Sequence, residues 1–358
     1  MFVHSTFCVG VTECLRLPCK HNIVCYCELG CWYVLGYFFG KLTPTISTPN
    51  YTSNFLKELS ENAPLTPRPT SSLILTHPPS GNAKTVRNDN SSRFGKFVEV
   101  RLDRRGGIRG AVLRDFLLER ARITGPAPRE TNYHVFYQLV EGAKHNAELR
   151  TTLRLRDDVQ FKYLRGEDAA AGAGRGGEQG KLEALQLALT VLQVPPHMCE
   201  GLFKVLAAIL WLGNLQFQDV DGERTTLAPE DSEAVEAVAN LLGLAAATAR
   251  RVLLERQINV RGNVTDIPLR LPEARENRHA MARALYARTF AWLVRHVNGC
   301  SAPGREAPRA LGVLDIFGFE NFATNSLEQL CINYANEKLH MFFNNYVFAL
   351  EQEIVSCV

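Results

Sequence analysis

The sequence predicts a helix-rich α/β fold. Two apolar runs of strand length, 97–102 and 311–317, are bounded by turn-forming residues. Between them, several longer segments carry apolar residues at spacings of three and four, the pattern of amphipathic helices. A chain that mixes short buried strands with longer amphipathic helices belongs to the α/β class.

The strands are predicted near the two ends of this region. Phe97–Leu102 is the first, and Arg104–Gly107 forms its turn. Ile108–Phe116 is predicted to return as a second strand and to lead into a helix that runs through Arg122. Leu311–Phe317 is an apolar run before a glycine, as expected of a buried strand that feeds a loop.

Helices are predicted where the apolar period is helical. In chain order they are Thr131–Glu141, Lys181–Leu192, Met198–Leu212, Asp231–Leu242 and Glu273–Val297. Asn298 and Gly299 are expected to end the last of them, because both residues favour helix C-termini. Gly166–Gly180, rich in Gly, Ala and Arg, is predicted to be a flexible surface loop.

A long helix is predicted near the C-terminal end of the chain. Asn325 is placed to cap it, and Glu328 completes the pattern of a capping box. No glycine or proline occurs from there to Glu353, so we expect one helix of about 43 Å.

Residues 1–80 differ in composition from the rest. Six of the ten cysteines fall within the first 31 residues, and Leu65–Ser80 is typical of a linker. The cluster from Cys19 to Cys31 matches no familiar zinc-finger spacing. We expect residues 1–80 to be disordered, or foreign to the domain that follows.

Composition argues against two classes of partner. A net charge of +3 gives no strong field for nucleic acid, so no nucleic-acid partner is expected. Ile23–Gly40 is apolar, but its Glu28 would cost roughly 2.5–3.5 kcal/mol at the bilayer centre. We therefore expect no membrane span.

Two polar runs lie beside the predicted strands. Asn88–Lys96 packs amides, hydroxyls and a guanidinium into a few residues, and these groups suit phosphate oxygens and Mg²⁺. Asp315–Glu320 places an acid and a glycine where a strand ends, an arrangement that can hold Mg²⁺ and admit a phosphate. Taken alone, each run is read first as an ordinary turn.

Together the two runs resemble the myosin motor domain. NDNSSRFGK (88–96) is similar to myosin switch I, and DIFGFE (315–320) is similar to switch II. NSLEQLCINYANEKLHMFFNNYVFALEQE (325–353) resembles the relay helix. NYHVFYQLVEGA (132–143) and FKVLAAILWLGNLQF (203–217) resemble two further myosin segments in the expected order.

The resemblance covers residues 81–354. It implies a partial myosin motor domain there, with residues 1–80 unlike myosin and residues 355–358 a foreign tail. The implied fold is part of a P-loop NTPase-like motor: the upper 50 kDa region, part of the central sheet and the relay helix.

The resemblance also implies roles for individual residues. The implied catalytic residues are Ser91, Arg93, Gly318 and Glu320. The implied nucleotide-binding residues are Asn88, Asn90, Ser91, Ser92 and Gly318. Ser92 would bind Mg²⁺ directly and Asp315 through water. Arg93 would pair with Glu320 when the switches close over the γ-phosphate of ATP.

The family's phosphate-binding loop, G-x-x-x-x-G-K-[ST], does not occur in these residues. Gly36–Thr43 comes nearest, but its spacing is wrong and it carries bulky aromatics. The resemblance therefore implies an ATP- and Mg²⁺-dependent motor that pulls on actin filaments in the cytoplasm as part of a myosin complex, present as a fragment without full ATPase competence.

The sequence leaves one alternative function open and argues against another. A non-catalytic myosin-like remnant, at most a binding module, stays open because of the missing loop. Kinesin-type motors are set aside, because their switches resemble SSRSH and DLAGSE. Asn263 stands where myosins often carry an acidic or phosphorylatable residue in an actin-contacting loop, with Thr265 and Pro268 nearby. Charge control of actin contact is therefore not expected.

Overall fold

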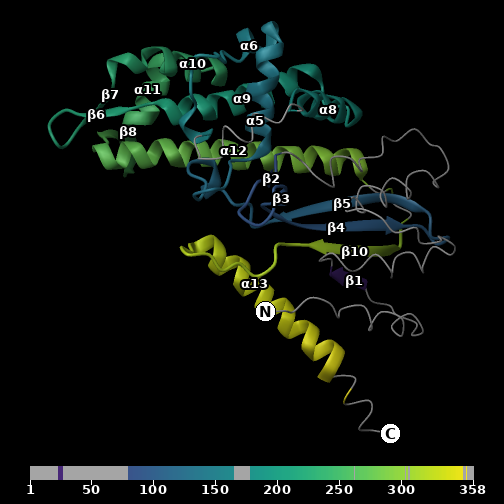
Figure 1. Cartoon of the computed structure of the whole chain (residues 1–358). Coiled ribbons are helices and arrows are strands. Elements are labelled where there is room, and N and C mark those ends of the chain that lie inside the picture. The colour runs from purple at the N-terminus through teal and green to yellow at the C-terminus, as the bar shows by residue number, and fades with distance from the viewer. Residues whose placement is uncertain are drawn as a thin grey trace. The chain divides into compact units, whose positions relative to one another are not determined.

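The computed structural model describes residues 23–26, 80–164, 178–261, 263–302 and 307–349, together with Gly304 and Gln352. The chain separates into two units, and each is described by itself (Figure 1). The first unit contains residues 1–76, 92–119 and 297–358. The second unit contains residues 77–91 and 120–296.

The first unit is built on a four-stranded mixed sheet in the order β1-β10-β4-β5. The strands are β1 (Ile23–Tyr26), β4 (Gly95–Leu102), β5 (Ile108–Phe116) and β10 (Arg309–Asp315). β10 pairs antiparallel with β4 and parallel with β1 (Figure 1). β1 comes from the segment predicted to be disordered, while residues 1–22 and 27–79 lie outside the described residues.

The turn between β4 and β5 is the one predicted. Asp103 Oδ1 accepts hydrogen bonds from the backbone N–H groups of Arg105 and Gly107, at 2.9 and 2.8 Å. Gly106 lies at φ 87°, a left-handed conformation that glycine adopts without a steric cost.

The helix predicted to run through Arg122 is absent. After β5 the chain is irregular, and only a short 3₁₀ turn forms at Ala121–Ile123. Leu117 takes a positive φ of 53°, and the Glu119 N–H donates to the Arg93 carbonyl at 3.0 Å. The backbone at Glu119 therefore bonds to Arg93, just before β4, and it does not form the helical hydrogen bonds that the sequence pattern predicted.

The long C-terminal helix differs from its prediction in its cap and in its last described turn, and residues 350, 351 and 353 of the predicted helix lie outside the described residues. α13 spans Leu327–Asn344 and continues as a π-helical turn at Asn345–Ala349. Ser326, one residue after the predicted cap, closes a capping box with Gln329 instead of Glu328. Asn325 bonds back to Phe322 instead. The change in helix type coincides with adjacent asparagines at 344 and 345, a residue type with low helix propensity.

The second unit is mostly helical (Figure 1). Its helices are α5 (His134–His145), α6 (Ala147–Thr152), α8 (Glu178–Val191), α9 (Pro196–Asn214), α10 (Ser232–Leu242), α11 (Ala246–Leu254) and most of α12 (Leu271–Ser301). Short strands form three ribbons: β2 (Asn82–Ala83) with β3 (Ser91–Ser92), β6 (Phe217–Asp219) with β7 (Thr225–Leu227), and β8 (Glu255–Val260) with β9 (Asn263–Pro268).

α9 forms the centre of the second unit. It packs against α5, α8 and α10, and its residues from Leu206 to Gly213 are all buried. A Cβ on Gly213 would lie 2.7 Å from the Tyr163 ring, so glycine is needed for this close approach. Tyr286 of α12 stacks on Tyr133 with ring centroids 4.9 Å apart.

Two predicted boundaries of helices are wrong, and the second has a tertiary reason. α8 already begins at Glu178, so Gly180 is helical, whereas residues 165–177 of the predicted loop lie outside the described residues. α12 passes through Asn298 and Gly299 to Ser301. The Asn298 side chain accepts from Leu113 N and donates to Leu113 O, at 2.7 and 2.8 Å, so its amide serves the edge of β5 and does not end the helix.

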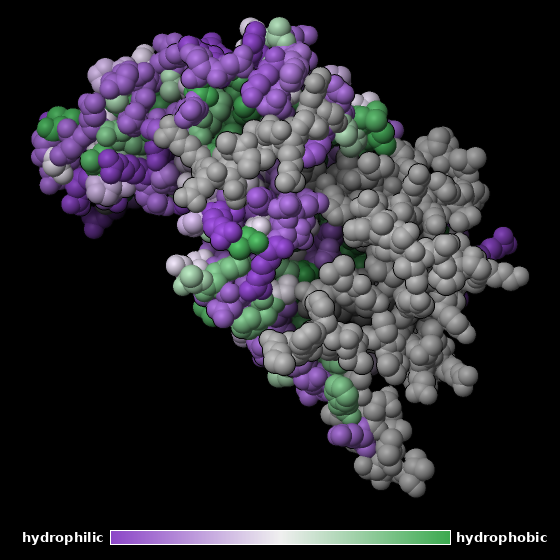
Figure 2. All heavy atoms as spheres, in the orientation of Figure 1, coloured by the Kyte–Doolittle hydropathy of each residue, from purple (hydrophilic) through white to green (hydrophobic). Residues whose placement is uncertain are grey.

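Within the described part of the chain, no single helix is both long and apolar enough to cross a bilayer; by length and composition alone, one bent pair of helices, Pro229–Leu242 with Ala246–Leu254, could. On the face in Figure 2, hydrophilic residues predominate over the helices of the second unit. Along α13, by contrast, large apolar side chains are exposed. They include Leu327, Leu330, Tyr334, Met341 and Phe342.

Candidate functional site

The first half of the 88–96 run forms a loop in the second unit. Asn88 Oδ1 accepts from Asn90 N at 2.9 Å, and the Asn88 backbone bonds to Thr85. Asn90 Oδ1 accepts from Asn82 Nδ2 at 3.0 Å. Asn88 and Asn90 are exposed, and Ser91 is half-buried in β3. The side-chain oxygens thus shape the loop.

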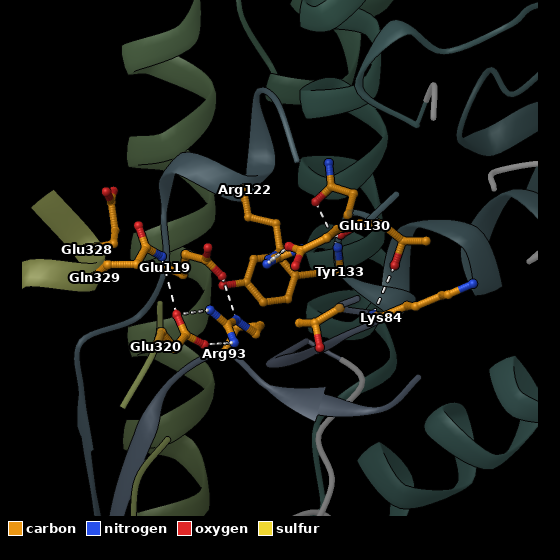
Figure 3. A network of polar contacts seen from close by, with 12 residues as sticks. Lys84, Arg93, Glu119, Arg122, Glu130, Tyr133, Glu320, Glu328 and Gln329 are labelled. Atoms are coloured by element: carbon orange, nitrogen blue, oxygen red, sulfur yellow. Dashed lines mark hydrogen bonds and ion pairs between the residues drawn. The ribbon is translucent and has the colours of Figure 1, made fainter. Parts of the chain in front are cut away.

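A buried ion pair supports the base of this loop (Figure 3). Arg122 donates to Glu130 at 2.6 Å and to the Thr131 carbonyl at 2.8 Å. Thr131 in turn bonds to Lys84 through both backbone and side chain. Both charged side chains are almost fully buried, so the pair fixes the chain where the loop leaves β2.

In the first unit, a doubly hydrogen-bonded ion pair of Arg93 and Glu320 joins the two runs. Arg93 Nη1 lies 2.7 Å from Glu320 Oε1, and Nη2 lies 3.2 Å from Oε2. The Arg93 side chain is 3% exposed and that of Glu320 is 10% exposed. Two parallel hydrogen bonds between planar groups fix orientation as well as distance. The predicted partnership of these two residues is present in this geometry.

α13 holds Glu320 from the other side. The Glu320 N–H donates to Asn333 Oδ1 at 2.8 Å, and Asn333 Nδ2 donates back to the Glu320 carbonyl at 2.7 Å. Gln329 Nε2 reaches Glu320 Oε2 at 3.3 Å. One turn further along, Asn336 donates to the Phe317 carbonyl at 2.9 Å. Gly318, half-buried, lies between these two attachments.

Sequence reasoning missed this polar stripe, although its signal was present. Gln329, Asn333 and Asn336 stand at i, i+4 and i+7, on one face of a helix. The prediction of this helix rested on its cap and on the lack of glycine and proline, and it did not use these polar residues.

Glu119 was also missed. Its Oε2 accepts from Arg93 Nε at 2.7 Å, and Figure 3 shows Arg93 between the two carboxylates. Burial by itself lowers the pKa of Arg93, but the hydrogen bond to Glu320 and the charge of Glu119 outweigh it and raise that pKa. Arg93 is therefore a permanent cation with two anionic partners. No local motif marks Glu119, which lies just after β5.

Asp315 and Ser92 are the predicted Mg²⁺ ligands. Asp315 ends β10, and its Oδ2 lies 2.8 Å from Lys96 Nζ. Ser92 is half-buried in β3. A hydroxyl and a carboxylate are oxygen donors that suit Mg²⁺. In this geometry the Lys96 ammonium already neutralises Asp315, and the described residues hold no cluster of three or more His, Cys, Asp or Glu that could bind a metal ion.

The chain is similar to known motor proteins over most of its length. A family model described as myosin head (motor domain) matches residues 73–356. Myosin-1 of Arabidopsis thaliana is 41% identical over 274 residues, which is 76% of this chain and 23% of that protein. The corresponding values for Myosin-I heavy chain of Dictyostelium discoideum are 40%, 76% and 12%. For Unconventional myosin-Vb of Mus musculus they are 38%, 76% and 15%.

The family match begins eight residues before the predicted boundary at 81 and includes both switch runs and α13. The chain spans less than a quarter of the length of these relatives. On the family match and the identity to these relatives, the chain belongs to the myosin head (motor domain) family, and it carries part of a myosin-type cytoskeletal motor.

Proposed function

We propose that the chain supplies the γ-phosphate-sensing switches of an ATP-dependent, actin-based motor with a P-loop NTPase-like core. The observation that carries this proposal is the buried, doubly hydrogen-bonded pair of Arg93 and Glu320. Such a pair connects the two switch loops, and it can exclude water from a phosphate that binds between them.

In the proposed site, amides and hydroxyls serve the phosphate oxygens. Asn88, Asn90, Ser91 and the N–H of Gly318 would donate to them. Ser92 and Asp315 would hold Mg²⁺, whose charge neutralises that of the phosphates. For Asp315 to do so, its contact with Lys96 must weaken. Catalysis of this type rests on positioning and on charge stabilisation, not on covalent chemistry by the protein.

The attachment of Glu320 to α13 supports a role in transmission. Asn333 bonds to the Glu320 backbone on both its N–H and its carbonyl, so displacement of residues 316–320 pulls on the helix directly. In the proposal, the position of residues 316–320 depends on the γ-phosphate. Because α13 is bonded to these residues, loop and helix switch together between two states.

Actin is the proposed partner, and the cytoplasmic cytoskeleton is the proposed location. The exposed hairpin β8–β9 carries Asn263 and Thr265, the positions where the resemblance implies actin contact. Asn263 is exposed in the first position of β9. The side chain there is neutral, so this hairpin would bind actin without a charge switch.

The missing phosphate-binding loop limits what the 358 residues do alone. Backbone N–H groups and a lysine normally anchor the triphosphate, and the switches do not replace them. Incomplete competence is therefore part of the proposal. It leaves the non-catalytic remnant as the second candidate.

A chimera separates the two candidates. Residues 1–80 are replaced by the segment that precedes the aligned region in Unconventional myosin-Vb of Mus musculus. Binding of a fluorescent ATP analogue, ATP hydrolysis and actin co-sedimentation are then measured for the original chain and the chimera. We expect no saturable micromolar binding by the original chain, and binding with hydrolysis by the chimera.

Point variants of the chimera then test the switch residues. Arg93→Ala and Glu320→Ala should retain nucleotide binding but lose hydrolysis by about 10²-fold or more, as when an electrostatic stabiliser is removed. The matched control is Arg109→Ala, a residue that pairs with Asp103 in the exposed β4–β5 turn. Hydrolysis unchanged by the Arg93 and Glu320 variants would refute the proposed site, and a folded chimera that binds no ATP would favour the remnant.

A further inference from the structure

Arg93 uses two separate edges of its guanidinium. The Nη edge faces Glu320, and the Nε–H points to Glu119 at 2.7 Å (Figure 3). A guanidinium carries five N–H donors in a rigid plane, so it can satisfy two carboxylates without changing its orientation. The Arg93 side chain is 3% exposed, that of Glu320 is 10% exposed and that of Glu119 is 12% exposed.

The two carboxylates are anchored to different parts of the first unit. The Glu119 N–H donates to the Arg93 carbonyl at 3.0 Å, just beyond the last β4–β5 pair, Gly95 with Phe116. Glu119 and Arg93 are therefore fixed to each other by the sheet. The backbone hydrogen bond between them does not involve residues 316–320.

Glu320 is anchored otherwise. It lies in an irregular segment after β10, and its backbone N–H and carbonyl both bond to the side chain of Asn333 in α13. Movement of this segment would separate Glu320 from Arg93 and leave Glu119 in place. A buried arginine without any partner would destabilise the open state strongly.

We infer that Glu119 is a positioning residue, which keeps the Arg93 guanidinium paired and oriented while Glu320 is withdrawn and returns. This inference rests on the proposed switch function. Because Glu119 restrains the Arg93 side chain beforehand, Glu320 closes onto a group that has already lost its rotamer freedom. Because Glu119 also pairs with the positive charge of Arg93, withdrawal of Glu320 does not leave a buried cation without an anionic partner.

The first test is a thermodynamic cycle on the 358-residue chain. Urea unfolding is measured for Glu119→Gln, Glu320→Gln and the double variant. If one carboxylate is enough to pair with Arg93, each single variant should have a small effect. The double variant should then lower the folding equilibrium constant by roughly tenfold more than the product of the two single effects. The control cycle combines E320Q with E99Q, because Glu99 pairs with Arg101 and Arg114 instead of Arg93.

The second test reads the guanidinium directly. The Nε–H signal of Arg93 is assigned by its loss in R93K, and its exchange with solvent is followed by NMR. Protection should persist in E320Q and in Glu320→Asp, and it should be lost in Glu119→Ala, which removes the acceptor oxygen. If the double variant does not fold, Glu119→Asp combined with E320D provides the same cycle with the charges retained.

Both tests measure the ion pairs of Arg93 without nucleotide, through unfolding and through Nε–H exchange. Their results are therefore independent of the chimera. Additive effects in the first cycle, or Nε–H protection that is lost in E320Q and kept in Glu119→Ala, would overturn the role of Glu119. If the chimera also fails to hydrolyse ATP while the cycle is non-additive, the pairing stands and the proposed switch function fails.

Discussion

Lys96 Nζ lies 2.8 Å from Asp315 Oδ2, and the two residues face each other at the last pair of the β4–β10 ladder. Lys96 is buried, whereas the Asp315 side chain is 39% exposed. The side chain that the sequence assigns to Mg²⁺ thus has a cationic partner from the neighbouring strand. Any divalent ion at Asp315 has to compete with this ammonium.

Removal of the Lys96 charge should destabilise the first unit. Lys96→Met keeps most of the aliphatic length, and we expect a loss of about 1–3 kcal/mol in the free energy of unfolding. Urea denaturation measures it. In the background of Asp315→Asn, Lys96→Met should lower the free energy of unfolding clearly less, because the carboxylate that the Lys96 ammonium neutralises is absent. Equal costs in both backgrounds would mean that the contact contributes nothing.

Asn333 should decide how tightly residues 316–320 follow α13. Asn333→Ala removes two hydrogen bonds to the Glu320 backbone, and we expect a loss of about 1–2 kcal/mol in stability. Hydrogen exchange at the Glu320 amide should accelerate in the same variant. Asn344→Ala, near the end of the same helix, is the matched control and should leave that amide unchanged. Protection of the Glu320 amide that survives Asn333→Ala would contradict the coupling.

Gly95 sets how closely the 316–320 segment approaches β4. A Cβ at this position would lie 2.9 Å from Ile316 Cγ2, closer than real side chains come. Gly95→Ala should therefore cost about 1–3 kcal/mol, as overpacking of a buried site does. Ile316→Ala removes the opposing methyl group, so G95A should be better tolerated in that background. Thermal unfolding of the four proteins measures the effect, and the idea is wrong if Ile316→Ala gives no relief.

His279 should make the stability of the second unit depend on pH. Arg278 can only donate, so His279 Nε2 accepts from it and Nδ1–H donates to the Tyr163 hydroxyl, each at 2.9 Å. Burial, followed by the charge of Arg278, lowers the pKa of His279 below its ordinary value of 6.5; Arg283 acts in the same direction, and Glu276 opposes them.

The sign of the pH effect follows from that shift. Below about pH 6.5 the unfolded chain binds a proton on His279 that the folded chain resists, so the free energy of unfolding falls as the pH drops. Above that pH the contribution is complete. His279→Gln keeps an acceptor for Arg278 and should flatten the profile between about pH 8 and pH 5.5. The profile comes from urea midpoints, and an unchanged slope in the variant would exclude His279 as the source.

The sequence was sufficient wherever local pattern and local structure agree. Helical spacing located α5, α8, α9, α10 and α12 within a few residues, and the Asp103–Gly107 turn followed from its own side chains. The family resemblance identified Arg93 and Glu320 as partners across 227 residues. That prediction drew on motif order, because no local property of either residue encodes the contact.

The sequence by itself determined the α/β class, the order of the elements, the family and the polar character of both switch runs. The partners of the buried charges came only from the folded chain: Glu119 for Arg93, and Asp315 for Lys96. The folded structure also explains why α12 continues beyond Asn298 and Gly299. The Asn298 side-chain amide bonds to the backbone of Leu113 in β5, so it is not available to cap its own helix. Periodicity reports which face of an element is apolar, but strand register and long-range pairing determine which charge meets which, and these exist only once the chain has folded.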